Sequence, residues 1–233
     1  MTDFDLFENI GETDKSLNGT VEKIQHEDTT LLRISSSFFD KYLEKGRHPK
    51  LIKNQTLHVI NYTATEFAEA RDATKQNKKD NEICSFKFSV VKKFLLAIEM
   101  SFGLSRSIFE VIRHSSCCLM IIGYMTKTED QYKFTYVGGS SYACSPSFGV
   151  LVPLLLVEEE VQNKGFGVAL LQCLQYFCNI KILNYHMLIW VATPSSKLIA
   201  FYRKLNFHPT ISSQYAIEHI LPAFISNVIN ATG

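Results

Sequence analysis

The segment most indicative of ligand binding is VQNKGFGVALL, residues 161–171, in which one residue separates Gly165 from Gly167. Glycine in an ordered segment costs backbone entropy, so it marks a tight turn or a close approach of a ligand to the backbone. The apolar residues that follow have the spacing of one buried helix face. The first N–H groups of a helix lack partners within it and carry the positive end of its dipole, so they bind phosphate groups. The segment therefore indicates a phosphate site at a helix start.

Other glycine loops that bind phosphates have different spacings. A P-loop has Lys-Ser or Lys-Thr after its second glycine, whereas here Lys164 precedes the first. A dinucleotide-binding loop has a third glycine where this sequence has Leu170, and it belongs to a strand–helix–strand unit with a downstream acid, which does not fit here. Both interpretations are disfavoured. A glycine-containing turn that binds no ligand stays open as a third interpretation.

Two further segments complete a more specific pattern around Gln162-x-x-Gly165-x-Gly167. The apolar run GVLVPLLLV, residues 149–157, precedes it, and SSKLIAFYRKLNF, residues 195–207, follows after one predicted strand. In their order and spacing these motifs resemble those of the GCN5-related N-acetyltransferases, the GNAT superfamily. The resemblance covers roughly residues 57–210. It implies an α/β fold with a mixed, splayed β-sheet flanked by helices.

The resemblance also implies a cofactor, acetyl-CoA, and residues that hold it. The pyrophosphate of coenzyme A would lie on the helix start, against Gln162, Asn163, Lys164, Gly165, Phe166, Gly167 and Val168. The pantetheine arm would pair like an added strand with the backbone of the splayed strand, at Leu155, Leu156 and Val157. Ser195 or Ser196 stands where the family has an asparagine near the cofactor. The shorter serine hydroxyl would still cap its helix.

For catalysis, Tyr202 matches the family tyrosine that gives a proton to the departing thiolate. A phenol has a pKa of about 10, near that of a thiol, which suits this general-acid role. The alternative is that Tyr202, on the apolar face of its predicted helix, only packs. A backbone N–H near Leu156 is the expected donor to the oxyanion that forms during acyl transfer.

The general base has no direct match. The two positions at which relatives carry a glutamate or a histidine are occupied here by Leu151 and Trp190, and neither accepts a proton. Glu158 is the first substitute that we consider. Tyr142, His186 and a water-only route are alternatives, and each of the three side chains also has a purely structural interpretation.

Composition bounds the class of protein. The chain has 233 residues, of which 46% are hydrophobic and 20% charged, as in ordinary globular proteins. A net charge of +1 gives no reason to expect direct nucleic-acid binding or an anionic membrane as partner. No run reaches the roughly 20 apolar residues that span a bilayer, and the N-terminus lacks the features of a signal peptide. We therefore expect an intracellular protein, cytoplasmic, nuclear or both.

The six cysteines show neither CxxC pairs nor metal-ligand spacing, so we expect reduced, mostly buried thiols and no metal site. Cys144 is conceivable as a covalent nucleophile. Nothing nearby in the sequence would activate its thiol, so direct transfer of the acetyl group is favoured.

Hydrophobic patterns predict the elements that position these residues. Residues 1–55 are expected to be an N-terminal extension with a helix at 31–46, before a GNAT domain at 56–233. Within that domain the order is a strand at 57–63, two helices, three strands, the helix after the glycines, a strand at 186–193 and a helix from Pro194 to Asn206. Residues 208–229 are ambiguous. Pro153 belongs where the pairing of its strand is interrupted, because proline lacks the N–H donor.

The sequence thus predicts an acetyl-CoA-dependent N-acetyltransferase that acts directly on a primary amine. A lysine of a protein, such as a histone, is the first choice of acceptor, with small amines and protein N-termini as alternatives. A non-catalytic acyl-CoA-binding or scaffold domain is the competing hypothesis, because both usual base positions are apolar.

Overall fold

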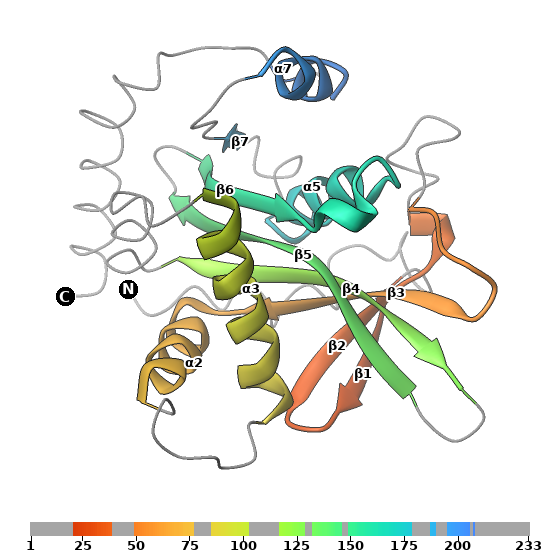
Figure 1. Cartoon of the computed structure of the whole chain (residues 1–233), viewed down its shortest axis with the longest axis vertical. Coiled ribbons are helices and arrows are strands. Elements are labelled where there is room, and N and C mark those ends of the chain that lie inside the picture. Colours follow the sequence, from red (N-terminus) through yellow and green to blue (C-terminus); the bar gives the residue numbers. More distant parts are fainter. Residues whose placement is uncertain are drawn as a thin grey trace.

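A computed structural model describes residues 21–38, 49–76, 85–102, 117–128, 132–145, 149–178, 187–189, 195–205 and 207. These residues form one seven-stranded sheet in the order β1-β2-β3-β4-β5-β6-β7 (Figure 1). Neighbouring strands are antiparallel from β1 to β6, whereas β6 and β7 are parallel. The strands are β1 (Val21–His26), β2 (Thr29–Ile34), β3 (Gln55–Tyr62), β4 (Cys118–Lys127), β5 (Tyr132–Ser145), β6 (Gly149–Val157) and β7 (Met187–Ile189).

Helices cover both faces of the sheet. On one face lie α2 (Ala64–Gln76) and α3 (Phe86–Phe102), and on the other lie α5 (Phe166–Phe177) and α7 (Ser196–Arg203). A short 3-10 helix, η3 (Glu159–Val161), connects β6 to the glycine segment. The protein therefore has an α/β fold, with a mixed sheet flanked by helices as predicted. No helix among the described residues is both long and apolar enough to cross a membrane.

Local sequence explains where α2 begins. Thr63 and Glu66 form a capping box: the Thr63 N–H donates to Glu66 Oε2 at 2.8 Å, and the Glu66 N–H donates to Thr63 Oγ1 at 3.3 Å. Lys87, in the first turn of α3, donates to Glu66 Oε1 at 3.3 Å. These bonds satisfy helix-start groups and join the two helices that cover one face.

The packing of α3 depends on a glycine in the sheet. A Cβ atom at Gly139 of β5 would lie 2.9 Å from the Phe94 ring and 2.8 Å from Ile121 Cδ1. Both distances are shorter than real contacts allow. Phe94 is fully buried, so the missing side chain lets α3 lie close to the centre of the sheet.

The N-terminal part differs from its prediction. The helix expected at 31–46 is wrong at its start, because Thr29–Ile34 is strand β2, paired with both β1 and β3. Leu31 and Ile34 are buried on opposite faces of the sheet while Arg33 is exposed, and β-branched threonines favour a strand. Residues 39–48 lie outside the described part. The domain boundary at residue 55 stays a prediction.

The other predicted elements agree with the structure where it describes them. The strand predicted at 57–63 is β3, the three following strands are β4 to β6, and the helix after the glycines is α5. Of the strand predicted at 186–193, only Met187–Ile189 is described. Asn206 and residues 208–229 lie outside the described residues.

Candidate active site

The two ends of β6 have different neighbours. On one side, β7 pairs only with Val150, Leu151 and Val152. On the other side, β5 pairs with β6 as far as Val157. Among the described residues, no strand therefore pairs with the second half of β6 on the β7 side. Residues 190–194, which follow β7, lie outside the described residues, so the splay between β6 and β7 stays a prediction; Figure 1 shows β7 as a short strand next to β6.

Pro153 lies where the pairing of β6 with β5 becomes irregular. The register between β5 and β6 shifts between Ser141 and Ala143, and the residues opposite them are Leu154 and Leu151. Pro153 is therefore part of the irregular stretch, as expected for a residue that cannot donate a ladder hydrogen bond. The interruption of pairing predicted from this proline is confirmed.

Strand alternation decides which backbone groups of β6 face the open side. The Glu158 N–H donates to the Val137 carbonyl of β5 at 2.9 Å. Because backbone groups of an antiparallel pair face their partner at every second residue, Leu156 also faces β5, while Leu155 and Val157 face away. The N–H of Leu156 is therefore not available on the open side as the expected oxyanion donor. The open-side N–H groups belong to Leu155 and Val157.

The segment after β6 is a tight loop. Asn163 and Gly165 have positive φ angles of 62° and 88°. The side chain of Gln162 donates from Nε2 to the Val157 carbonyl at 3.2 Å, which closes the loop onto the end of β6. On the outer side, the Lys50 N–H donates to the Lys164 carbonyl at 2.9 Å. Gln162 thus shapes the loop, and the Lys50 contact was not predictable from the motif.

The start of α5 offers backbone donors. Its first helical bond runs from the Ala169 N–H to the Gly165 carbonyl at 3.0 Å, and no side chain caps the helix. In the described part of the chain, the N–H groups of Phe166, Gly167 and Val168 have no acceptor. Three such donors at one helix start suit a phosphate group.

Gly167 is not required by the packing of the protein itself. A Cβ atom there would lie 3.6 Å from both the Phe201 ring and Val157 Cγ2, which are ordinary contact distances. The side chains of Asn163 and Lys164 are exposed beside it, whereas Phe166 is buried and packs 6.5 Å from the Tyr124 ring. The polar residues of the predicted site therefore face solvent, and Phe166 holds the helix to the sheet.

Tyr202 lies on α7, packed between aromatic rings. Its ring centroid is 5.1 Å from that of Phe201 and 5.9 Å from that of Phe207. Burial raises the pKa of Tyr202 to about 12, so the phenol keeps its proton at neutral pH. The side chain packs, and it also holds a proton that it can donate. Ser195 caps the same helix, its Oγ accepting from the Leu198 N–H at 3.2 Å.

The structure separates the candidate bases. Tyr142 is fully buried and donates to Asn61 Oδ1 at 2.6 Å, and burial raises the pKa of its phenol well above the ordinary value. Tyr142 is thereby removed as a base. Glu158 is half-buried and directly follows the open stretch of β6. His186 and Trp190 lie outside the described residues, and Leu151 is buried.

Cys144 has a neighbour that its sequence context did not reveal. A hydrogen bond from the Cys178 thiol, at the end of α5, lowers the pKa of Cys144. Cys144 pairs with Val150, so it lies at the closed end of β6 and not beside the open stretch. Direct transfer stays the favoured route. Cys117, Cys173 and Cys178 are buried, as expected for small hydrophobic residues.

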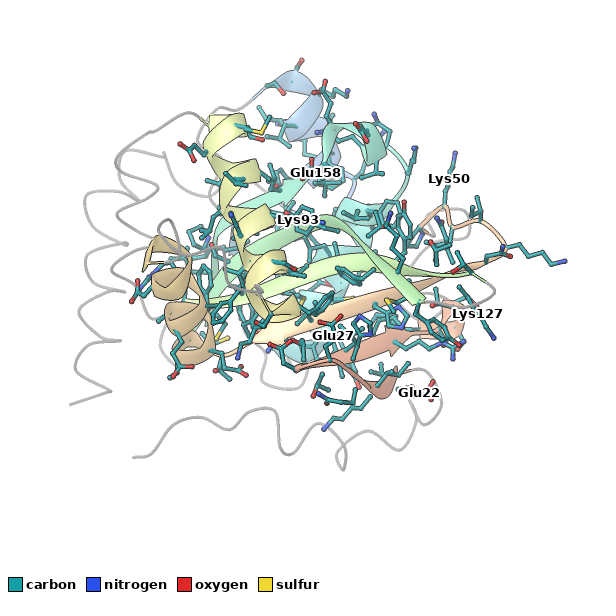
Figure 2. The ribbon with its side chains drawn as sticks, turned by 60° about the horizontal axis from the view of Figure 1, so that its bottom comes forward. Glu22, Glu27, Lys50, Lys93, Lys127 and Glu158 are labelled. Atoms are coloured by element: carbon teal, nitrogen blue, oxygen red, sulfur yellow. The ribbon has the colours of Figure 1, made fainter. Side chains whose placement is uncertain are left out.

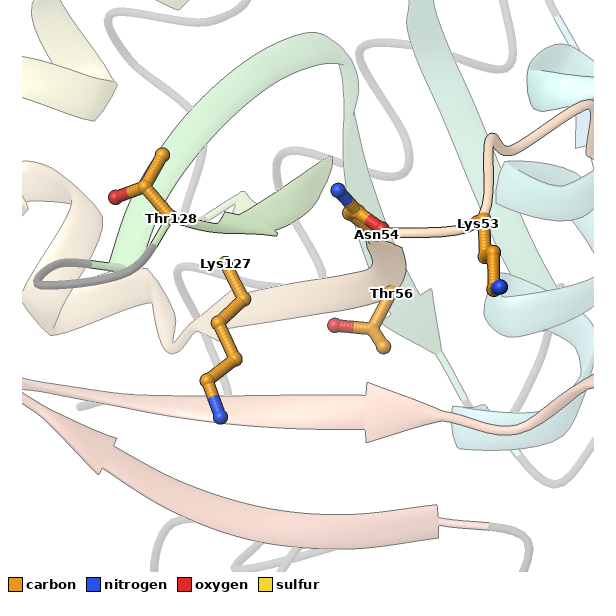
Figure 3. Close-up of a pocket in the computed structure, with 5 residues that line it drawn as sticks. All are labelled: Lys53, Asn54, Thr56, Lys127 and Thr128. Carbon is orange, nitrogen blue, oxygen red and sulfur yellow. The ribbon is translucent and has the colours of Figure 1, made fainter.

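A shallow polar pocket of about 440 Å³ lies elsewhere, where β3 begins and β4 ends (Figure 3). Its lining contains none of the predicted site residues: Lys53, Asn54, Thr56, Lys127 and Thr128. The pocket is therefore separate from the open edge of β6 and the start of α5. Among the described residues, no cluster of ligands could hold a metal ion.

The sequence matches no protein-family model and no curated protein. Among solved structures, the chain is similar to the crystal structure of a ribosomal-protein-alanine N-acetyltransferase from Brucella melitensis biovar Abortus 2308. The identity is 13%, the TM-score is 0.32, and the match covers 66% of this chain and 95% of that chain. A likeness this low does not decide the function, so the geometry of the site has to support it.

Proposed function

We propose that the protein is an N-acetyltransferase that takes the acetyl group from acetyl-CoA and transfers it directly to a primary amine. One observation carries this proposal: among the described residues, no strand pairs with the second half of β6 on the β7 side, and this half leads through a tight loop to a helix start whose first N–H groups have no acceptor. An unpaired strand edge accepts an extended amide chain, and the helix start accepts a pyrophosphate. Coenzyme A contains both groups in one molecule.

The backbone of the chain would do most of the binding. Leu155 and Val157 would pair with the amides of the pantetheine arm, and the N–H groups of Phe166, Gly167 and Val168 would hold the pyrophosphate. Gly167 would let phosphate oxygens come close to the backbone, because it carries no side chain and the nearest protein atoms beside it are at ordinary contact distances of 3.6 Å. Lys164 and Asn163 would add polar contacts at the exposed rim.

Two side chains would handle protons. A free lysine ammonium has a pKa of about 10.4, so it must lose a proton before its nitrogen attacks a thioester. In our proposal the Glu158 carboxylate accepts that proton. Tyr202, which stays protonated, gives one to the thiolate that departs, and an N–H of Leu155 or Val157 donates to the developing oxyanion.

The acceptor that we propose first is a lysine side chain of a protein such as a histone, as the sequence resemblance implies. Small amines and protein N-termini are the other acceptor classes. The proposed location is inside the cell, in the cytoplasm, the nucleus or both.

Two measurements test the function. Coenzyme A should raise the melting temperature of the protein, because a ligand that binds only the folded state stabilises it. Acetyl-CoA mixed with histone peptides or polyamines should then release free thiol at a rate that depends on the protein. Stabilisation without thiol release on any amine would indicate a non-catalytic acyl-CoA-binding domain. Absence of stabilisation at millimolar coenzyme A would overturn both hypotheses.

A further inference from the structure

The hydroxyl group of Tyr136 raises an energetic question. Tyr136 lies in β5 with 9% of its surface exposed, and its hydroxyl is buried without a hydrogen-bond partner among the described residues. Burying a hydroxyl that makes no hydrogen bond is unfavourable. A phenylalanine would fill the same space without this cost. We therefore look for a group that could accept a hydrogen bond from this hydroxyl when a substrate is bound.

Glu158 is the candidate for that partner, because it is the charged group that acts on the Tyr136 phenol. Its N–H bonds to the carbonyl of Val137, which is the extra residue of a bulge in β5, and Tyr136 is next along that strand. Because side chains alternate along a strand, Glu158 points to the same face as Leu156, which packs in one cluster with Tyr136. Burial and the negative charge of Glu158 both raise the pKa of the Tyr136 phenol, so the phenol stays protonated and can donate.

The Glu158 carboxylate is itself uncommitted. It is half-buried, and no ion pair or hydrogen bond joins its side chain to another described residue. Figure 2 labels Glu158 with other charged side chains around the sheet. Its position directly after Val157 puts the carboxylate at the end of the open stretch of β6. A carboxylate without a partner at this place can take a cation.

We propose that Glu158 binds the ammonium group of the acceptor and that Tyr136 is a positioning residue, whose hydroxyl donates to the Glu158 carboxylate in the acceptor complex. The inference builds on the proposed function and adds to it. The acceptor arrives as a protonated primary amine, on the face of the sheet that α2 and α3 cover. The face that carries α5 and α7 is left to the acyl donor.

Steady-state kinetics with acetyl-CoA and a lysine peptide test the inference on three variants. Glu158→Gln keeps the size of the side chain and removes its charge, so KM for the amine should rise about tenfold or more. Tyr136→Phe should raise the same KM about fivefold, the worth of one hydrogen bond, with little change in kcat. Glu159→Gln is the matched control: its carboxylate is exposed on η3, and its KM should equal that of the parent protein.

A second readout separates a positioning role from a structural one. Tyr136→Phe removes a buried hydroxyl that has no partner among the described residues, so its melting temperature should be unchanged or higher even though the KM rises. The thermal shift caused by coenzyme A should be the same in all variants. Equal KM values in the parent protein, Glu158→Gln and Tyr136→Phe would overturn the inference while leaving the proposed function intact.

If the protein acetylates no amine, the proposed function fails and binding alone decides the inference. Calorimetric titration with N-α-acetyl-lysine N-methylamide then serves as the probe. Binding to the parent protein that is lost in Glu158→Gln would support the ammonium site. No binding to the parent protein, or equal binding to the variant, would refute it.

Discussion

Two pairs of glycines in this protein differ in why a side chain is missing there. Gly138 and Gly139, in the middle of β5, are glycines because the protein leaves no room: a Cβ atom would lie 2.4 Å from the Leu156 carbonyl oxygen or 2.8 Å from Ile121. Gly165 and Gly167 stand in a loop and at a helix start. The first has a φ of 88°, and the second has only ordinary contacts at 3.6 Å beside it.

The comparison separates structural from functional glycines. The β5 pair is explained by the close approach of the neighbouring strands β4 and β6 and of helix α3. Gly167 has no such explanation within the protein. A glycine that the fold does not need is best explained by a ligand that needs the space, and the donors around it suit a phosphate. Substitutions at the two pairs should therefore have different consequences.

Gly167→Arg should have the largest effect on binding. A long side chain at the helix start would occupy the pyrophosphate site, so coenzyme A should no longer raise the melting temperature. The parent protein at a hundredfold excess over Kd should gain about 2.7 kcal/mol of stability. Gly167→Ala is the control and should fold normally, because its Cβ meets only ordinary contacts. Differential scanning fluorimetry with and without coenzyme A makes both measurements.

Tyr202→Phe tests a second residue near the helix start. Tyr202 packs against Phe201, and Phe201 lies beside Gly167. The ring contacts stay, so the melting temperature and the affinity for coenzyme A should not change. The proton donor is lost, and kcat should fall about 100-fold. Thiol release under saturating substrates measures kcat, and turnover equal to that of the parent protein would show that Tyr202 only packs.

Gly139→Ala should destabilise the protein through contacts with α3 and β4. The added methyl group meets Phe94, Ile121 and a β4 carbonyl oxygen, and such overpacking costs about 1–3 kcal/mol. Urea denaturation should show a lower midpoint with an unchanged slope. A midpoint like that of the parent protein would mean that α3 can move away from β5.

Gly165→Ala should have the smallest effect of the four. At a φ of 88° a Cβ atom is strained, which costs about 1–2 kcal/mol. Part of this would appear as lower stability and part as weaker binding of coenzyme A, because the loop precedes the donors of α5. Gly165→Asn is the comparison variant, since asparagine tolerates left-handed backbone better, and it should lose less stability than alanine does.

Local patterns predicted much of the fold. The apolar spacing of α5 and the continuous run of β6 appear in the sequence because each element buries a fixed face. Pro153 even marked where the pairing of β6 is interrupted. The hairpin at 21–34 was missed because Leu31 and Ile34 fit a helical spacing as well as a strand, and only pairing with β3 decides between them.

The site was less predictable for the same reason. Which backbone groups of β6 face the open side depends on its register with β5, and a shift of one residue exchanges Leu156 for its neighbours. The buried hydroxyl of Tyr136 is a property of packing between β5 and α3. The contact of Lys50 with Lys164 joins segments that are distant in the chain. None of these relations has a local sequence pattern.

The hydrogen bond between Lys50 and Lys164 also gives the protein a built-in reporter. The Lys50 amide is protected only while the glycine loop keeps its conformation. Its rate of deuterium exchange therefore reports the opening of that loop, although Lys50 is not itself a proposed binding residue. A ligand on the start of α5 should slow exchange at this one amide before it changes any global property. One peptide fragment in a mass spectrum would thus follow the occupancy of the site.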